Sequence, residues 1–145
     1  AIEQLEPEVD EIFMGNVYPA RDLLGIAKAL LAGEMAYRAG DAATAVLAFE
    51  EAVAMQDALP YTEPPFWYYP TRQSLGAALL ASNRFAEAQA VFERDLEQYP
   101  MNGWSMFGLA EALRRQGDDA EAGKVAARFE TVWQFADVEL TSSIL

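Results

Sequence analysis

The feature that most constrains this chain is a pattern of small and apolar residues that recurs at a fixed spacing. At an offset of 34 residues, Leu75 pairs with Leu109, Gly76 with Ala110, Leu79 with Leu113, Asn83 with Gly117 and Ala88 with Ala122. At an offset of 43 residues, Gly33 pairs with Gly76, Gly40 with Asn83, Ala45 with Ala88 and Phe49 with Phe92. A repeat of this length predicts a stack of helix–turn–helix units that share one core.

The two offsets differ by nine residues, and the difference falls in the stretch 57–69, which is rich in proline and aromatic residues. We interpret this stretch as an insertion into an otherwise regular array. Its three prolines exclude a helix. The pair Pro64-Pro65 favours an extended, polyproline-like path.

The recurring residue types have physical reasons. Small residues are expected where two antiparallel helices cross closely, at Gly33, Gly76 and Ala110 and, on the facing helices, at Ala45, Ala88 and Ala122. Types that tolerate positive φ stand where a helix should end, at Gly40, Asn83 and Gly117. Phe49 and Phe92 are predicted to fill the space between neighbouring helix pairs. The third copy has Ala126 where phenylalanine is expected, and Phe129 and Trp133 are predicted to refill that space.

Apolar residues at helical spacing predict six helices, over about Arg21–Ala39, Ala42–Gln56, Pro70–Ser82, Arg84–Gln98, Gly103–Gln116 and Asp118–Ala136. A short helix is also expected at about Pro7–Met14, with a frayed acidic tail as the alternative. Residues 137–145 show no helical period and are expected to be extended. The last helix has an apolar side made of Val125, Phe129, Val132, Trp133 and Ala136. Either the tail folds back over this side or a second copy of the chain covers it as a homodimer.

Composition restricts the function classes. With 23 acidic residues against 10 basic ones the net charge is −13, which disfavours nucleic acid and anionic membranes and favours a basic or apolar partner. The chain has no cysteine and no histidine, so thiolate nucleophiles, the usual zinc ligands and the imidazole base of most hydrolytic triads are missing. We therefore assign no catalytic, cofactor or metal residues. Absence of cysteine fits either the cytoplasm or a secreted setting.

The residues Leu75-Gly76, Leu79, Ala88, Phe92 and Pro100 have the spacing of a tetratricopeptide repeat, and the chain resembles this family from about Ile26 to Ala136. The resemblance implies an all-α fold of antiparallel helix pairs stacked in a right-handed superhelix. One domain, 1–145, would comprise a lead-in with a capping helix (1–25), repeats at 26–59, 69–102 and 103–136, the insertion at 60–68 and a tail at 137–145. Residues 64–76 and 102–109 also look like the C-terminal part of longer bacterial members, which implies further repeats upstream and supplies no activity.

In this family the first helix of each pair lines a concave groove that binds other proteins. Carried onto this chain, the expected partner-binding residues are Glu34, Tyr37, Gln73, Trp104, Phe107, Glu111 and Arg114. Members that grip the C-terminal carboxylate of chaperones use Lys, Arg and Asn at such places, whereas Glu34, Ala77 and Glu111 stand at the ninth repeat position here. We expect a non-enzymatic scaffold or adaptor for a peptide with apolar and basic residues. The alternative for Trp104 and Phe107 is plain packing under the insertion.

The aromatic run of the insertion has two interpretations. Phe66, Trp67 and Tyr68 could form a stacking platform, which would make the chain a small-ligand-binding protein. They could equally anchor the long loop onto the repeats, because an insertion without a helix needs its own apolar attachment. Anchoring is the interpretation that we favour.

Overall fold

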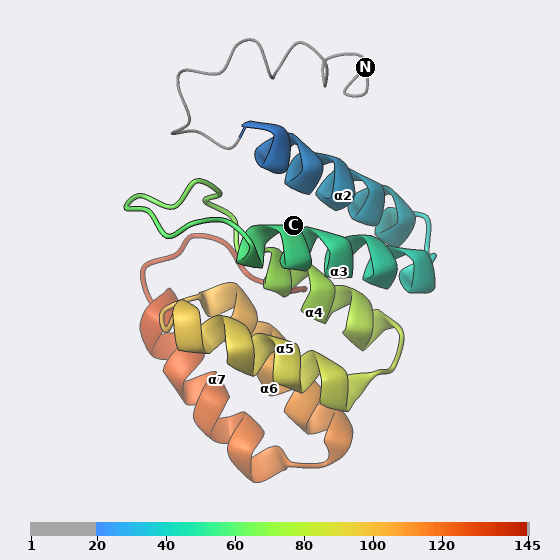
Figure 1. The fold of residues 1–145 in the computed structure, drawn as a ribbon. Helices are drawn as coiled ribbons and strands as arrows, with labels where there is room; N and C mark the ends of the chain where they lie inside the picture. Colours follow the sequence, from blue (N-terminus) through green and yellow to red (C-terminus); the bar gives the residue numbers. More distant parts are fainter. Residues whose placement is uncertain (1–19, 145) are drawn as a thin grey trace. The chain divides into compact units, whose positions relative to one another are not determined.

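A computed structural model of the chain describes residues 20–144, and within this range it contains α-helices and no strand. The helices are α2 (Ala20–Arg38), α3 (Ala42–Asp57), α4 (Thr71–Ala81), α5 (Phe85–Gln98), α6 (Gly103–Gln116) and α7 (Asp119–Trp133). Consecutive helices are joined by tight turns, except for the long loop between α3 and α4 (Figure 1). The all-α class and the packing of helices in adjacent pairs, both expected from the repeat, are confirmed.

The chain divides into two compact units, the first ending at Thr71 and the second beginning at Arg72. In the described part of the first unit, α2 and α3 run antiparallel (Figure 1). Phe49 of α3 is fully buried against Gly33 of α2, where a β-carbon would lie under 3.0 Å from its ring. Ala45 and Ala52, one turn on either side of Phe49, are also fully buried, so the small residues allow this close approach.

The second unit contains α4 from Arg72 onward, then α5, α6 and α7. Phe92 of α5 is fully buried and faces two glycines, Gly76 of α4 and Gly108 of α6. The ring therefore packs against α4, the partner of α5 in its own helix pair, and against α6, the first helix of the next pair. This is the position expected of a side chain that joins neighbouring pairs. In the third copy, Trp133 lies over Gly103 and stacks with Phe129, so these two aromatic residues pack α7 against α6. That they refill the space of Ala126 stays a prediction.

The helix ends follow the local rules. Gly40, Asn83 and Gly117 have φ values of +80°, +58° and +83°, which confirms the expected left-handed turns. Asp41 and Asp118 begin α3 and α7 by accepting hydrogen bonds from the backbone N–H groups three residues on. Pro70 lies just before α4 rather than inside it, since the helix begins at Thr71, and α7 ends at Trp133, three residues earlier than predicted.

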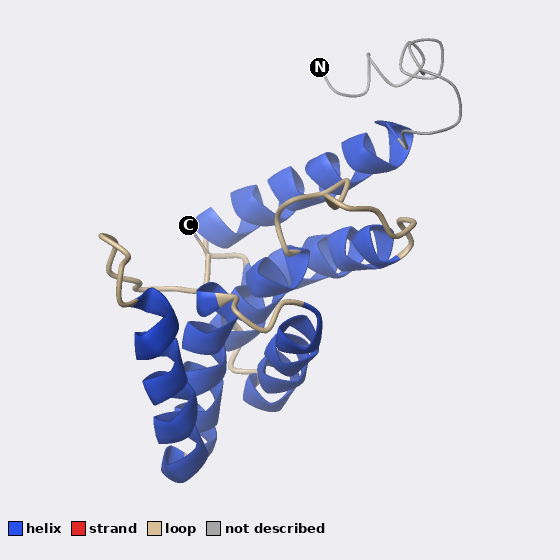
Figure 2. Ribbon diagram, turned by 90° about the vertical axis from the view of Figure 1, so that its left-hand side faces the viewer, coloured by secondary structure: helices blue, strands red, loops and turns tan. Residues whose placement is uncertain are grey.

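Two segments of the described chain lack regular structure. One is the loop between α3 and α4, seen in tan in Figure 2. The other is the tail after α7, which contains no helix or strand up to residue 144, as expected. The helix expected at Pro7–Met14 lies outside the described residues.

Candidate functional site

One side of α6 carries the expected aromatic pair. Trp104 and Phe107 project from the first turns of this helix, which begins at Asn102 through a hydrogen bond from Trp104 N to Asn102 Oδ1 (3.1 Å). Both side chains are half-buried. Trp104 meets Trp133 edge to face at 5.7 Å between ring centroids, and Phe107 meets Phe129 in the same way at 5.9 Å. The rings are thus supported by α7, and each keeps part of its surface exposed.

The polar residues of this face lie one and two turns further along α6. Glu111 is 3.7 Å from both Arg114 and Arg115. Arg115 is turned aside, with its guanidinium 4.5 Å from the ring of Phe85 and a hydrogen bond to Asn83 Oδ1. Because the two ion pairs are long and open to solvent, they hold Glu111 weakly. Its carboxylate can therefore leave the two arginines and form an ion pair with a lysine or arginine of a partner.

Gln73 differs from the other expected groove residues, because its side chain is 3% exposed. Its Oε1 accepts a hydrogen bond from Asn102 Nδ2 (3.2 Å), and its backbone carbonyl accepts one from Ser143 Oγ (3.3 Å). A side chain buried in this way presents no surface to a peptide. We therefore remove Gln73 from the set of contact residues.

A buried carboxylate lies beside Gln73, and the sequence reasoning missed it. Asp95 of α5 is 1% exposed, and its Oδ2 accepts hydrogen bonds from Ser105 Oγ (2.6 Å) and Asn102 Nδ2 (2.7 Å). Its Oδ1 accepts none from the described residues. Burial raises the pKa of Asp95, although the hydrogen bonds and the charge of Arg72 oppose the shift. The signal was available, because Asp95 aligns with Phe129 at the 34-residue offset, which puts an acid at an apolar repeat position.

In the first unit, α2 carries the expected groove residues Glu34 and Tyr37. Both are half-buried. Glu34 Oε2 accepts a hydrogen bond from Nε of Arg38 at 3.3 Å, four residues further along the helix. The two residues supply an acid and an aromatic ring on one stretch of α2, the same combination that α6 carries in the second unit.

The aromatic residues of the insertion differ widely in exposure. Phe66 and Trp67 are half-buried, whereas Tyr68 is 87% exposed and lies beside Trp67 with 6.2 Å between ring centroids. The far end of the loop is fixed to α3 by Gln56, which donates to Tyr69 O (3.1 Å) and accepts from Thr71 N (2.9 Å). The loop therefore has a polar anchor in Gln56, and Tyr68 remains on the surface.

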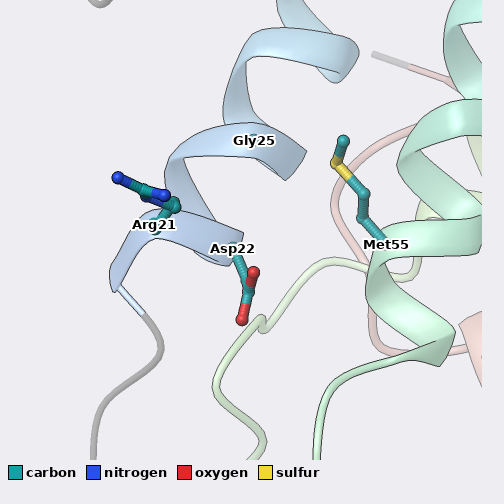
Figure 3. Close-up of a pocket in the computed structure, with 4 residues that line it drawn as sticks. All are labelled: Arg21, Asp22, Gly25 and Met55. Carbon is teal, nitrogen blue, oxygen red and sulfur yellow. The ribbon is translucent and has the colours of Figure 1, made fainter. Parts of the chain in front are cut away.

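A hollow of about 390 Å³ opens between the start of α2 and the end of α3. It is lined by Arg21, Asp22, Gly25 and Met55 (Figure 3). Met55 reaches from α3 toward Gly25, where an added β-carbon would be 3.0 Å from its sulfur. No sequence pattern pointed to this hollow, because it depends on a gap between two helices and not on a motif.

Among the residues that the structure describes, no group of side chains is arranged to bind a metal ion. No three acidic side chains gather there in a way that could hold an ion. Over the same residues, no helix is both long and apolar enough to cross a bilayer. What the surfaces offer instead is aromatic rings beside carboxylates.

Residues 74–132, which include most of α4 and nearly all of α7, match the model of the tetratricopeptide repeat family. Over these residues the chain is similar to tetratricopeptide repeat proteins. The glycine–phenylalanine contact of α4 and α5 recurs between α2 and α3, upstream of the matched residues. No curated protein and no solved structure matches the chain. Tetratricopeptide repeats are in general modules for protein–protein interaction and typically not catalysts.

Proposed function

We propose that this tetratricopeptide chain is a non-enzymatic scaffold or adaptor that binds a peptide segment carrying apolar and basic residues. The observation that carries the proposal is the face of α6, where Trp104, Phe107 and Glu111 are spaced three and four residues apart and so share one side of the helix. Half-exposed rings can receive apolar anchors, and aromatic residues dominate the binding energy of many interfaces. A carboxylate beside them favours a lysine or arginine on the partner.

The charge of the chain supports the basic character of the partner. A net charge of −13 attracts cationic segments over a distance set by the ionic strength, about 10 Å at 0.1 M salt. On α2, Glu34 and Tyr37 repeat the acid-and-ring combination and form the proposed contact of the first unit. Arg114, 47% exposed at the end of the α6 face, completes the set for the second.

The test is capture of peptides from a synthetic set in which apolar and basic residues are varied independently. We expect Trp104→Ala and Phe107→Ala each to weaken binding by about tenfold or more. Glu111→Gln should weaken it less and flatten its salt dependence. Glu97→Gln is the control, because Glu97 is also an exposed acid paired with an arginine of its own helix, Arg94 on α5. Unchanged capture by the folded Trp104 and Phe107 variants would refute the assignment of this face.

A second candidate function, binding of a small ligand, is favoured by the insertion. Tyr68 exposes 87% of its surface while Trp67 lies beside it, an arrangement that suits stacking of a flat ligand. A thermal-shift screen with metabolites tests it: a hit should disappear in Tyr68→Ala and survive in Tyr61→Ala, a change at a tyrosine of the same loop that is 85% exposed.

A further inference from the structure

The tail returns from the end of α7 to α4 (Figure 1). It is attached at both ends of this path. The indole N–H of Trp133 donates to Val138 O at 2.7 Å, and Ser143 Oγ donates to Gln73 O at 3.3 Å. Trp133 is the ring that supports Trp104 on α6, and Gln73 is on α4. The tail is thus bonded to α4 directly, and to Trp133, the α7 ring that supports Trp104 of α6.

The tail buries some of its side chains and exposes others. Leu140, Ser143 and Ile144 are 8%, 1% and 6% exposed. The three residues before Leu140 are exposed, with Val138 at 52% beside Asp137 and Glu139. Thr141, which follows Leu140, also faces solvent. A segment without helix or strand that inserts some side chains and leaves the intervening ones in water has the form of a bound peptide.

We infer that residues 137–144 are a tethered occupant of the inner-helix surface of the second unit, and that a partner peptide must displace them to bind there. The tail reaches α4 at the backbone carbonyl of Gln73, a position where the family pattern expects a partner contact. The inference rests on the proposed function for the identity of the surface, and on the tail contacts for its occupation.

The tail also indicates what a competing partner should look like. Its buried residues are two aliphatic side chains four positions apart, Leu140 and Ile144, and a small hydroxyl at Ser143. Its outward residues include two acids, Asp137 and Glu139, which are poorly suited to a chain with a net charge of −13. A segment with aliphatic side chains at the same spacing would fill the same positions as Leu140 and Ile144. Lysines at its outward positions would be attracted by the negative charge of the chain, so this segment should replace the tail.

The experiment uses the full chain and labelled synthetic peptides. The probe is the sequence of residues 137–145, and a second probe carries Asp137→Lys and Glu139→Lys. Release of the tail is achieved with the double variant Leu140→Asp/Ile144→Asp, and Val138→Ser is the control because it changes only an exposed side chain. Binding is read by fluorescence anisotropy, and folding by circular dichroism.

We expect the released variant to bind the probe at least about tenfold more tightly than the parent or the Val138→Ser chain, because an attached segment competes at an effective concentration of the order of millimolar. The lysine probe should bind the released variant more tightly still. Equal, weak binding of both probes to a folded released variant and to the parent would overturn the inference.

A second measurement decides the question if the double variant fails to fold. Hydrogen exchange at residues 140–144 of the parent chain is followed while the lysine probe is added, and displacement must accelerate it, whereas unchanged exchange at saturating probe would refute displacement. The two proposals remain separable. Equal capture of library peptides by parent and released chains would refute the tethered occupant alone. Probe binding to the released chain without any capture of library peptides would refute the proposed function alone.

Discussion

The ring of Phe92 occupies the space in which Gly76 would carry a β-carbon: an added β-carbon would lie under 3.0 Å from ring atoms. The same ring closes against Gly108 on the next helix. One fully buried side chain therefore joins α4, α5 and α6, and glycine is the residue type that leaves it room on both sides.

The first prediction concerns this contact. Gly76→Ala should lower the free energy of unfolding by about 1–3 kcal/mol, the usual cost of overfilling a packed core, despite the better helix propensity of alanine. Gly123→Ala is the matched control, because Gly123 lies inside α7 and no atom lies within 4 Å of its added β-carbon. This control should be neutral or stabilising by up to about 1 kcal/mol. Urea denaturation measures both, and equal effects would contradict the contact.

The second prediction concerns the buried carboxylate. Asp95→Ala removes the acceptor of the hydrogen bonds from Ser105 and Asn102. Asn102 Nδ2 keeps Gln73 Oε1 as an acceptor, whereas the buried hydroxyl of Ser105 loses the one that Asp95 supplied. One donor left buried and unpaired costs about 1–3 kcal/mol, so we expect a loss of this size in chemical denaturation. Asp95→Asn keeps an acceptor oxygen and removes the buried charge, and should cost much less. If the two variants were equally unstable, the hydrogen bonds would not be the source of the loss.

Asp95 should also make the stability of the folded chain depend on pH. Burial raises its pKa in the folded chain above 3.8, its value when exposed. The folded state therefore binds this proton more tightly, and the stability gained from protonation is complete below pH 3.8 and is lost as the pH rises through the folded pKa. We expect the stability of the parent relative to Asp95→Asn to fall as the pH rises above 3.8. A pH-independent difference would be inconsistent with a raised pKa.

Asp41 should show the opposite sign. Its side chain accepts hydrogen bonds from Thr44 Oγ1 (2.7 Å) and Thr44 N (3.0 Å), and these lower its pKa below 3.8. The stabilisation is present above pH 3.8 and is lost as the pH falls through the folded pKa. Relative to Asp41→Asn, which keeps an N-cap acceptor, the parent should lose stability only at acid pH. Thermal unfolding of the parent and of Asp41→Asn from pH 2.5 to pH 7 measures this loss. A difference in stability between the two chains that does not change with pH would count against a lowered pKa of Asp41.

Gln56 is predicted to control the insertion. Gln56→Ala removes the acceptor of the hydrogen bonds from Thr71 and the donor to Tyr69 O. The loop should then open more often, so chymotrypsin should cut faster beside the exposed Tyr61 and Tyr68. Gln89→Ala is a control, since Gln89 bonds to Glu93 and Gln116 on the second unit's surface. Equal cleavage rates in parent and Gln56→Ala would show that the loop is held by other contacts.

Much of the helical framework could be predicted because it depends on short-range rules. A helix places residues three and four apart on one side, so the apolar spacing located each described helix to within a few residues. Glycine and asparagine at Gly40, Asn83 and Gly117 marked the turns, since left-handed φ is costly for other residues. The repeat register predicted a close helix crossing at Gly76, and the structure shows that the ring of Phe92 fills it.

Sequence alone therefore determined the class of fold, the helix pairs and the aromatic and acidic character of α6, because each depends on local geometry that recurs along the chain. The tertiary structure decided which of those residues are accessible. It buried Gln73, placed Trp133 behind Trp104, and brought Ser143 to a carbonyl 70 residues earlier in the chain. Such contacts depend on which distant groups meet when the core closes, and a periodic pattern contains no information about a tail that lies outside the period.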